Sequence, residues 1–146
     1  MEPDIKDWHV TNVSKSRTTI PLSSIHQAIG MLVEISKKEI GETLEFKHSK
    51  QGMISCTAGN GRSSISFLPE YDQRTQSLAG ERHVLSTDES GKFYHADRSG
   101  NVSSISASRL VPILDAVRGL VYIFESHSVP EFLQWSEPVQ RTAPLG

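Results

Sequence analysis

The segment from Leu110 to Phe124 constrains the fold most, because its apolar residues recur at the spacing of a helix with one buried face. The residues that share this predicted face are Leu110, Ile113, Leu114, Val117, Leu120, Val121 and Phe124. Ser108 is the candidate N-cap, and Pro112 fits only the first turn, where its missing N–H costs no hydrogen bond. We expect residues 127–130 to end this helix. An apolar helical face must be covered by another layer, so the chain must form a second layer of secondary structure.

A second helix is predicted directly after Ser24. Ser24 and Gln27 have the spacing of a capping box, in which each side chain satisfies an exposed backbone N–H group of the other residue. The residues that then recur at helical spacing are Ile25, Ala28, Ile29, Leu32 and either Ile35 or Ser36. The pair Lys37-Lys38 suits the negative end of the helix dipole, and we expect the helix to end at Gly41.

Short segments with alternating apolar residues lie around the two predicted helices and are separated by turn residues. The predicted strands are Asp7–Val13, Thr43–Lys47, Met53–Ala58, Ser63–Leu68, Glu81–Ser86, Lys92–Ala96, Val102–Ile105 and Glu131–Trp135. Most connections are too short for parallel crossovers, so the strands should form one antiparallel sheet. The order strand, helix, strands, helix predicts an α+β fold with both helices packed on that sheet. We expect one domain over residues 1–146, with a frayed tail from about residue 139.

The charge and hydropathy of the chain limit its partners. Its formal net charge is −2, and its fifteen Lys and Arg residues are scattered, whereas nucleic-acid binding needs a basic patch. The longest strongly apolar stretch, Leu120–Phe124, is far below the roughly 20 residues of a membrane span. The acidic start, Met1–Asp4, does not resemble a signal peptide. We therefore expect a cytoplasmic protein that binds neither nucleic acid nor membrane directly.

No sequence pattern predicts a catalytic residue, a metal or a cofactor. The six histidines lack the paired spacing of zinc ligands, although His83 and His95 could meet across strands. The single cysteine, Cys56, lies in a strand pattern, which favours a buried core residue over a nucleophile. The glycines of Gly59–Ser64 are followed by strand periodicity, so they predict a hairpin turn and not a phosphate-binding loop.

The segment from Pro69 to Asp97 is unevenly charged, with six acidic and three basic residues. Acidic loops with an exposed aromatic residue suit a partner with a basic cleft, because charge steers the encounter and aromatic side chains anchor it. The alternative interpretation of each acidic residue is an ordinary solvated loop charge. The predicted partner-binding residues are Glu70, Tyr71, Asp72, Glu81, Asp88, Glu89 and Tyr94.

Three segments between Gly80 and Pro138 resemble one protein family. Phe93–Asn101 is similar to its aromatic strand followed by a glycine turn, and Ser108–Val117 is similar to its proline-led helix. Phe124–Trp135 resembles its closing pattern, a helix-ending Phe, a short turn, Pro-Glu and then Trp. At that turn the family often carries a glycine and a basic residue, whereas residues 127–129 of this chain are His-Ser-Val. The family is the first-numbered immunity-protein family of bacterial polymorphic toxin systems.

The resemblance implies a small α+β protein that is encoded beside a secreted toxin, often a nuclease or nucleic-acid deaminase. Such a protein binds the toxin in the cytoplasm and blocks its active site, so we expect a non-enzymatic monomer in a 1:1 complex. One alternative is a small enzyme that reverses the toxin's modification, which needs converging groups such as His83, His95 and a nearby acid. Another alternative is a secretion chaperone or adaptor, a class that more often dimerises.

Overall fold

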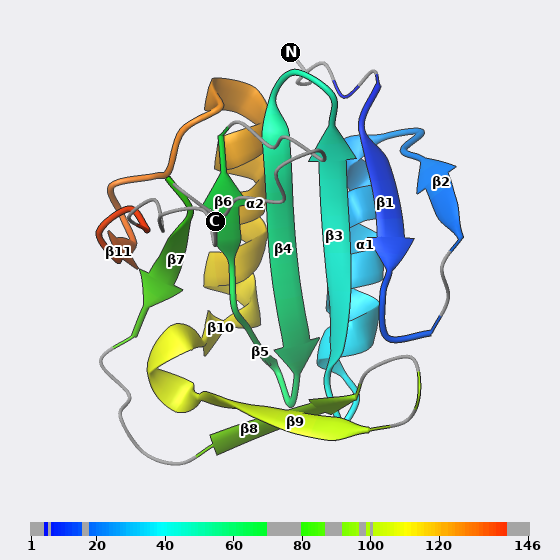
Figure 1. Ribbon diagram of the computed structural model, residues 1–146, viewed down its shortest axis with the longest axis vertical. Helices are drawn as coiled ribbons and strands as arrows, with labels where there is room; N and C mark the ends of the chain where they lie inside the picture. The colour runs from blue at the N-terminus through cyan, green and yellow to red at the C-terminus, as the bar shows by residue number, and fades with distance from the viewer. Residues whose placement is uncertain are drawn as a thin grey trace, which may run out of the picture.

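The computed structural model describes residues 5, 7–15, 18–69, 80–86, 92–96, 99 and 101–139. Both helices lie on the same face of a large antiparallel sheet, and a short hairpin lies across one end of it (Figure 1). The predicted α+β fold, with the order strand, helix, strands, helix, is confirmed. The expected frayed tail falls largely on residues 140–146, which lie outside the described residues.

The main sheet has the strand order β11-β7-β6-β4-β3-β1-β2, with β5 and β10 paired beside the end of β4. The helices are α1 (Ile25–Ser36) and α2 (Ile113–Ser126), and a 3-10 turn spans Ala107–Arg109. The strands are β1 (His9–Asn12), β2 (Thr19–Pro21), β3 (Glu42–His48), β4 (Gly52–Gly59), β5 (Arg62–Ser63), β6 (Ser66–Leu68), β7 (Arg82–Leu85), β8 (Lys92–Ala96), β9 (Val102–Ser106), β10 (Val111–Pro112) and β11 (Gln134–Trp135).

Helix α1 begins as predicted but ends earlier. The Gln27 N–H donates to Ser24 Oγ at 3.1 Å, while the Gln27 side-chain oxygen accepts from the Ser23 N–H at 2.8 Å, one residue before the cap. The helix ends at Ser36 with Lys37 as its C-cap, so the predicted end at Gly41 is wrong. Gly41 instead contacts the hairpin, where its missing side chain leaves space for an aromatic ring.

Helix α2 begins at Ile113, directly after Pro112, and has no side-chain cap. The predicted cap at Ser108 is wrong, because Ser108 belongs to the 3-10 turn and its own N–H donates to Ser106 Oγ. Leu110 precedes the helix, and Leu114 is 74 % exposed, so the predicted apolar face is wrong at both positions. The buried residues of the helix are Ala116, Gly119, Leu120, Ile123 and Phe124.

The predicted strand over residues 63–68 is two shorter strands, β5 and β6, interrupted at Ser64 and Ile65. Ser64 Oγ accepts from the Thr57 N–H at 2.9 Å, and the Ser64 N–H donates to the Thr57 carbonyl at 2.9 Å. A side-chain hydroxyl therefore replaces one backbone acceptor of the ladder, and alternation within a single strand is lost. Ile65 is fully buried at this break.

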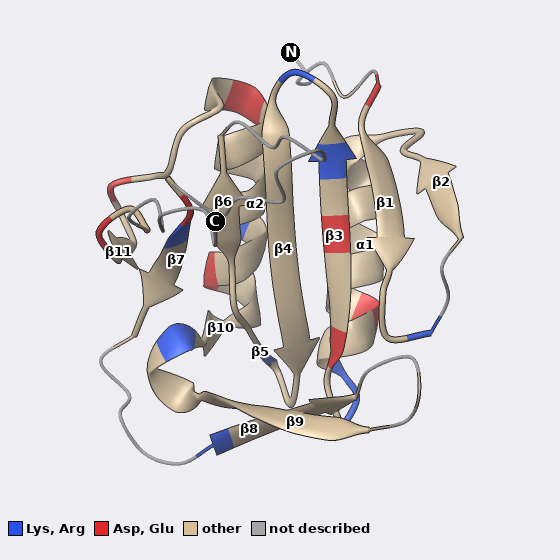
Figure 2. Cartoon of the chain, in the orientation of Figure 1, with Lys and Arg blue, Asp and Glu red and all other residues tan. Residues whose placement is uncertain are grey.

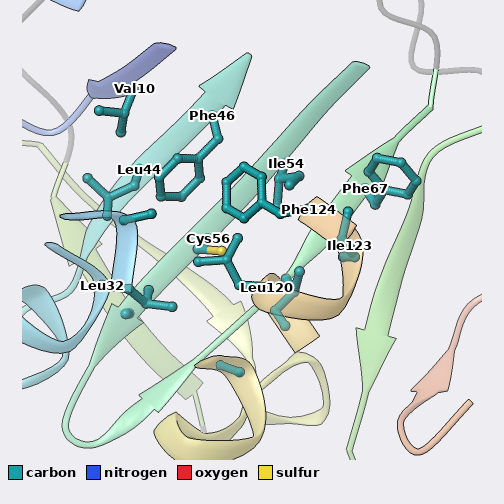
Figure 3. Close-up of a cluster of buried hydrophobic side chains, with 14 of the residues drawn as sticks. Val10, Leu32, Leu44, Phe46, Ile54, Cys56, Phe67, Leu120, Ile123 and Phe124 are labelled. Carbon is teal, nitrogen blue, oxygen red and sulfur yellow. The ribbon is translucent and has the colours of Figure 1, made fainter. Parts of the chain in front are cut away.

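The main core lies between the sheet and the two helices. Figure 3 shows strand residues such as Phe46 and Ile54 facing Leu32 of α1 and Phe124 of α2. The Phe124 ring packs edge-on against Trp8, with 5.0 Å between ring centroids, and against Phe46 at 5.8 Å. These contacts fix both helices on one face, so the other face of the sheet carries the alternate residues of each strand.

A buried acidic residue lies where β3 begins. The Glu42 carboxylate accepts hydrogen bonds from Lys38 Nζ at 2.7 Å and Asn12 Nδ2 at 3.0 Å, and Lys15 Nζ lies 3.8 Å away. Burial alone would raise the pKa of Glu42, but the hydrogen bonds from Lys38 and Asn12 and the charges of both lysines outweigh it. The pKa of Glu42 therefore lies below its ordinary value of 4.5.

Replacing this carboxylate should make the free energy of unfolding change less as the pH falls into the acid range. A lowered pKa in the folded state stabilises the fold above the unfolded pKa, and the stabilisation is lost as pH falls through the folded pKa. We expect Glu42→Gln to lower the free energy of unfolding by about 1 kcal/mol at about pH 7, and by less at about pH 3.5, in urea titrations. The control is Glu34→Gln, which removes an exposed ion pair with Lys37 and should change little. Equal losses for both variants at neutral pH would contradict this role.

Candidate protein-binding surface

Strands β8 and β9 form a separate two-stranded hairpin, so the prediction that residues 102–105 complete the main sheet is wrong. The hairpin is attached through Phe93, which is 2 % exposed and whose ring lies against Gly41 and Gly59. A Cβ atom at Gly41 would overlap the ring, and one at Gly59 would lie 2.8 Å from Phe93 Cζ. The ring fits only against glycine backbone. Phe93 therefore holds the hairpin across the end of β3 and β4, and not beside an edge strand of the sheet.

Two backbone hydrogen bonds hold the hairpin in register. The Gly41 N–H donates to the Tyr94 carbonyl at 2.9 Å, and the Ala96 N–H donates to the Gly41 carbonyl at 3.0 Å. Gly41 thereby pairs with His95 in a parallel bridge. The hairpin is thus anchored on one face by an aromatic ring and at one edge by backbone hydrogen bonds.

The opposite face of the hairpin is exposed and partly apolar. Tyr94 alternates with the buried Phe93 and is 54 % exposed, and Val102, opposite Ala96, is 52 % exposed. Ile40, which directly precedes the bridging Gly41, is 50 % exposed. We define the hairpin surface as Ile40, Lys92, Tyr94 and Val102. A surface that exposes a tyrosine together with aliphatic residues has the composition of a protein-binding site.

Of the predicted partner-binding residues, only Glu81 and Tyr94 lie within the described residues. Glu70, Tyr71, Asp72, Asp88 and Glu89 lie outside them.

Glu81 and Tyr94 are not brought together by the fold. Glu81 directly precedes β7 of the main sheet, where its carbonyl accepts from the Val139 N–H at 2.9 Å, whereas Tyr94 is on the separate hairpin. Burial raises the pKa of Glu81, and the positive charge of Arg109 partly offsets that rise. Glu81 is half-buried, and the charge of Arg109 acts on its carboxylate.

The described charges do not favour a purely acidic surface. Basic and acidic residues are scattered singly over the described chain in Figure 2, and Lys92 of the hairpin surface is basic. The excess of acidic residues predicted for the segment 69–97 falls mostly on positions that the structure does not describe.

The face of the sheet that the helices leave open carries a row of polar residues. Register aligns Thr11, Glu45, Ser55, Ser66 and His83 across five strands. Burial lowers the pKa of His83, and the positive charge of Arg109 lowers it further. His83 is not opposite His95, because β7 belongs to the main sheet and β8 to the hairpin. Among the residues that the structure describes, no group of three His, Cys, Asp or Glu side chains could hold a metal ion.

Cys56 is fully buried on the helix-facing side of β4, as predicted (Figure 3). Burial raises the pKa of its thiol to about 12. Because the thiolate is the reactive form, we expect a thiol reagent such as DTNB to label the native protein very slowly at about pH 8 and the urea-unfolded protein rapidly. Fast labelling of the native protein would contradict a core position and reopen the interpretation of Cys56 as a nucleophile.

A hollow lies between β6, β7 and the end of α2. The hollow has a volume of about 420 Å³. It is lined by Phe67, Pro69, Arg82, Tyr122, His127, Ser128, Val129 and Glu131. Beside it the Phe132 ring packs edge-on against Tyr122, and the Arg118 guanidinium carbon lies 4.5 Å from the Phe132 ring centroid. The sequence analysis did not predict this hollow. The only sequence feature that pointed to this region was the turn at 127–129, which lines the hollow and differs from the family pattern.

No protein-family model matches the sequence, and no curated protein matches it either. The family resemblance of the segment from Phe93 to Trp135 therefore stays a prediction from the sequence. No helix among the described residues is long and apolar enough to cross a membrane.

Proposed function

We propose that this chain is an immunity protein that binds a cognate secreted toxin in the cytoplasm and blocks its active site. In this proposal the protein acts as a monomer in a 1:1 complex and uses no cofactor. The observation that carries the proposal is the hairpin surface, which exposes Tyr94 together with Ile40 and Val102. The class of partner comes from the resemblance of residues 93–135 to immunity proteins.

The anchoring of the hairpin supports a binding role. A loop that must become ordered on binding loses conformational entropy, whereas a surface that is already fixed does not. Phe93 and the two hydrogen bonds of Gly41 fix the hairpin before any partner arrives. Tyr94 therefore offers a large contact area at low entropic cost.

The acidic residues of the preceding segment suit the proposed class of toxin. A toxin that acts on nucleic acid has a basic substrate cleft, and acidic side chains can occupy the places of its phosphates. Asp88 and Glu89 precede β8 closely in sequence, so they remain predicted contacts, together with Glu70 and Asp72. Glu81 is a weaker candidate because it is half-buried.

Co-expression tests the proposal directly. We expect cells that express the toxin domain encoded beside this chain to grow only when this chain is also expressed, and the two purified proteins to co-elute. An unrelated toxin serves as the control and should not be neutralised. The proposal is wrong if growth is not restored and the proteins elute separately.

One observation favours a second candidate function, an enzyme that reverses the toxin's modification. The aligned row on the open face of the sheet contains Glu45, Ser66 and His83, which are residue types used in nucleophilic and acid–base catalysis. An enzyme of this kind would protect cells or substrates at far less than one molecule per toxin molecule. Protection that requires one molecule of this protein per toxin molecule would instead indicate a binder.

A further inference from the structure

Among the described residues, no strand pairs with the outer edge of β9. Gly41 bonds to Tyr94 and Ala96 of β8, so these residues point their backbone groups away from β9. The pairs that bond β8 to β9 are therefore Phe93 with Ile105 and His95 with Ser103. By the same alternation, Val102 and Ser104 direct their backbone N–H and C=O groups outward, and no described residue forms a backbone hydrogen bond with them.

This edge lacks the protection that the other edges have. The main sheet ends on one side at β2, which has three residues and closes with Pro21, and on the other at β11, which has two residues. Strand β9 has five residues, Val-Ser-Ser-Ile-Ser, with no charged residue and no proline. Natural proteins usually protect an exposed edge with such residues, because an open edge pairs with other strands.

Resting on the proposed function, we infer that the outer edge of β9 binds an extended segment of the toxin, which adds a strand to the hairpin. The outward N–H and C=O groups of Val102 and Ser104 are matched by an extended peptide backbone. Pairing through β9 alone would use five residues a side, so the occupant must also contact the adjoining hairpin surface, which is the proposed toxin-binding surface. A stable interface needs about 20–30 residues a side. The hairpin surface next to the edge provides further contacts for a toxin.

Hydrogen exchange on the wild-type protein tests this inference without any substitution. In the free protein the amides of Val102 and Ser104 should exchange rapidly, while those of Ser103 and Ile105, which bond to β8, are protected. In the purified complex with the toxin domain, Val102 and Ser104 should become protected by about tenfold or more. Unchanged exchange at both residues would overturn the inference. Protection that rises with the concentration of the free protein would also overturn it, because the occupant would be a second copy.

A matched pair of variants separates the backbone from the side chain. Ser104→Pro removes an outward N–H group that β8 does not use, and proline is tolerated at strand edges, so the hairpin should persist. We expect Ser104→Pro to weaken toxin binding by about tenfold and Ser104→Ala to leave it within about twofold. Equal binding by both variants would overturn the inference while leaving the proposed function intact, whereas a wild-type protein that does not bind the toxin would disprove the proposed function itself.

Discussion

Phe93→Ala will lower the free energy of unfolding by about 3–5 kcal/mol, because it removes a buried ring from a site that the surrounding glycines cannot fill. Phe93 is 2 % exposed and packs on Gly41 and Gly59, which have no side chains that could move into the space. The backbone hydrogen bonds to Gly41 would still link the hairpin to the main sheet, but without the buried ring. The variant should therefore bind the toxin weakly as well as unfold easily.

Chemical unfolding in urea measures the first part of this prediction. The control is Tyr94→Ala, one residue along the same strand but on its exposed face, which should change the free energy of unfolding by no more than about 0.5 kcal/mol. If Phe93→Ala unfolds at the same urea concentration as the wild-type protein, Phe93 does not anchor the hairpin.

Tyr94→Ala will weaken binding of the toxin by about 30-fold, equivalent to roughly 2 kcal/mol, without changing the stability of the free protein. Tyr94 is 54 % exposed, yet its backbone carbonyl is held by Gly41, so its ring is presented from a fixed position. Truncation of such an aromatic anchor removes contact area that a toxin would cover and desolvate. Titration calorimetry with the toxin domain measures the change.

The matched control for this loss is Tyr122→Ala. Tyr122 is also partly exposed, at 37 %, but it lines the hollow beside α2 and not the hairpin. We expect its truncation to leave toxin binding within about threefold of the wild-type value. The reverse pattern, a large loss for Tyr122→Ala and none for Tyr94→Ala, would place the toxin at the hollow and contradict the assignment of the hairpin surface.

The parts of the fold that follow from local chemistry could be predicted from the sequence. Ser24 begins α1 because its side chain accepts from the Gln27 N–H, and His127 ends α2 in a left-handed conformation with φ of 56°. The alternation in β3 places Leu44 and Phe46 in the core, as their spacing indicates. Each of these features depends on residues a few positions apart.

The parts that depend on distant residues could not be predicted in this way. Phe93 separates the hairpin from the main sheet only because Gly41 and Gly59 lie beneath it, and nothing local to β8 reveals that contact. Leu114 has helical spacing with Val117 and Val121, but α2 starts late and is rotated so that Leu114 is exposed.

The candidate site, too, could be predicted from the sequence only where it depends on local residues. Tyr94 could be singled out as an aromatic residue in a charged segment, and the structure places it on an exposed face. Composition could not show that Glu81 is half-buried near Arg109, because Arg109 is distant in sequence. The open edge of β9 follows from the bonds of Gly41 to β8, so it appears only once the hairpin is folded and docked.

Titration of the purified toxin domain with this protein, followed by calorimetry and by the toxin's residual activity, tests the proposed function most directly. A binder that blocks the active site should give a single transition at one protein molecule per toxin molecule, with activity falling linearly to that point. Protection that is complete at a small fraction of this ratio would indicate an enzyme. No heat of binding and no loss of toxin activity would contradict the proposed function altogether.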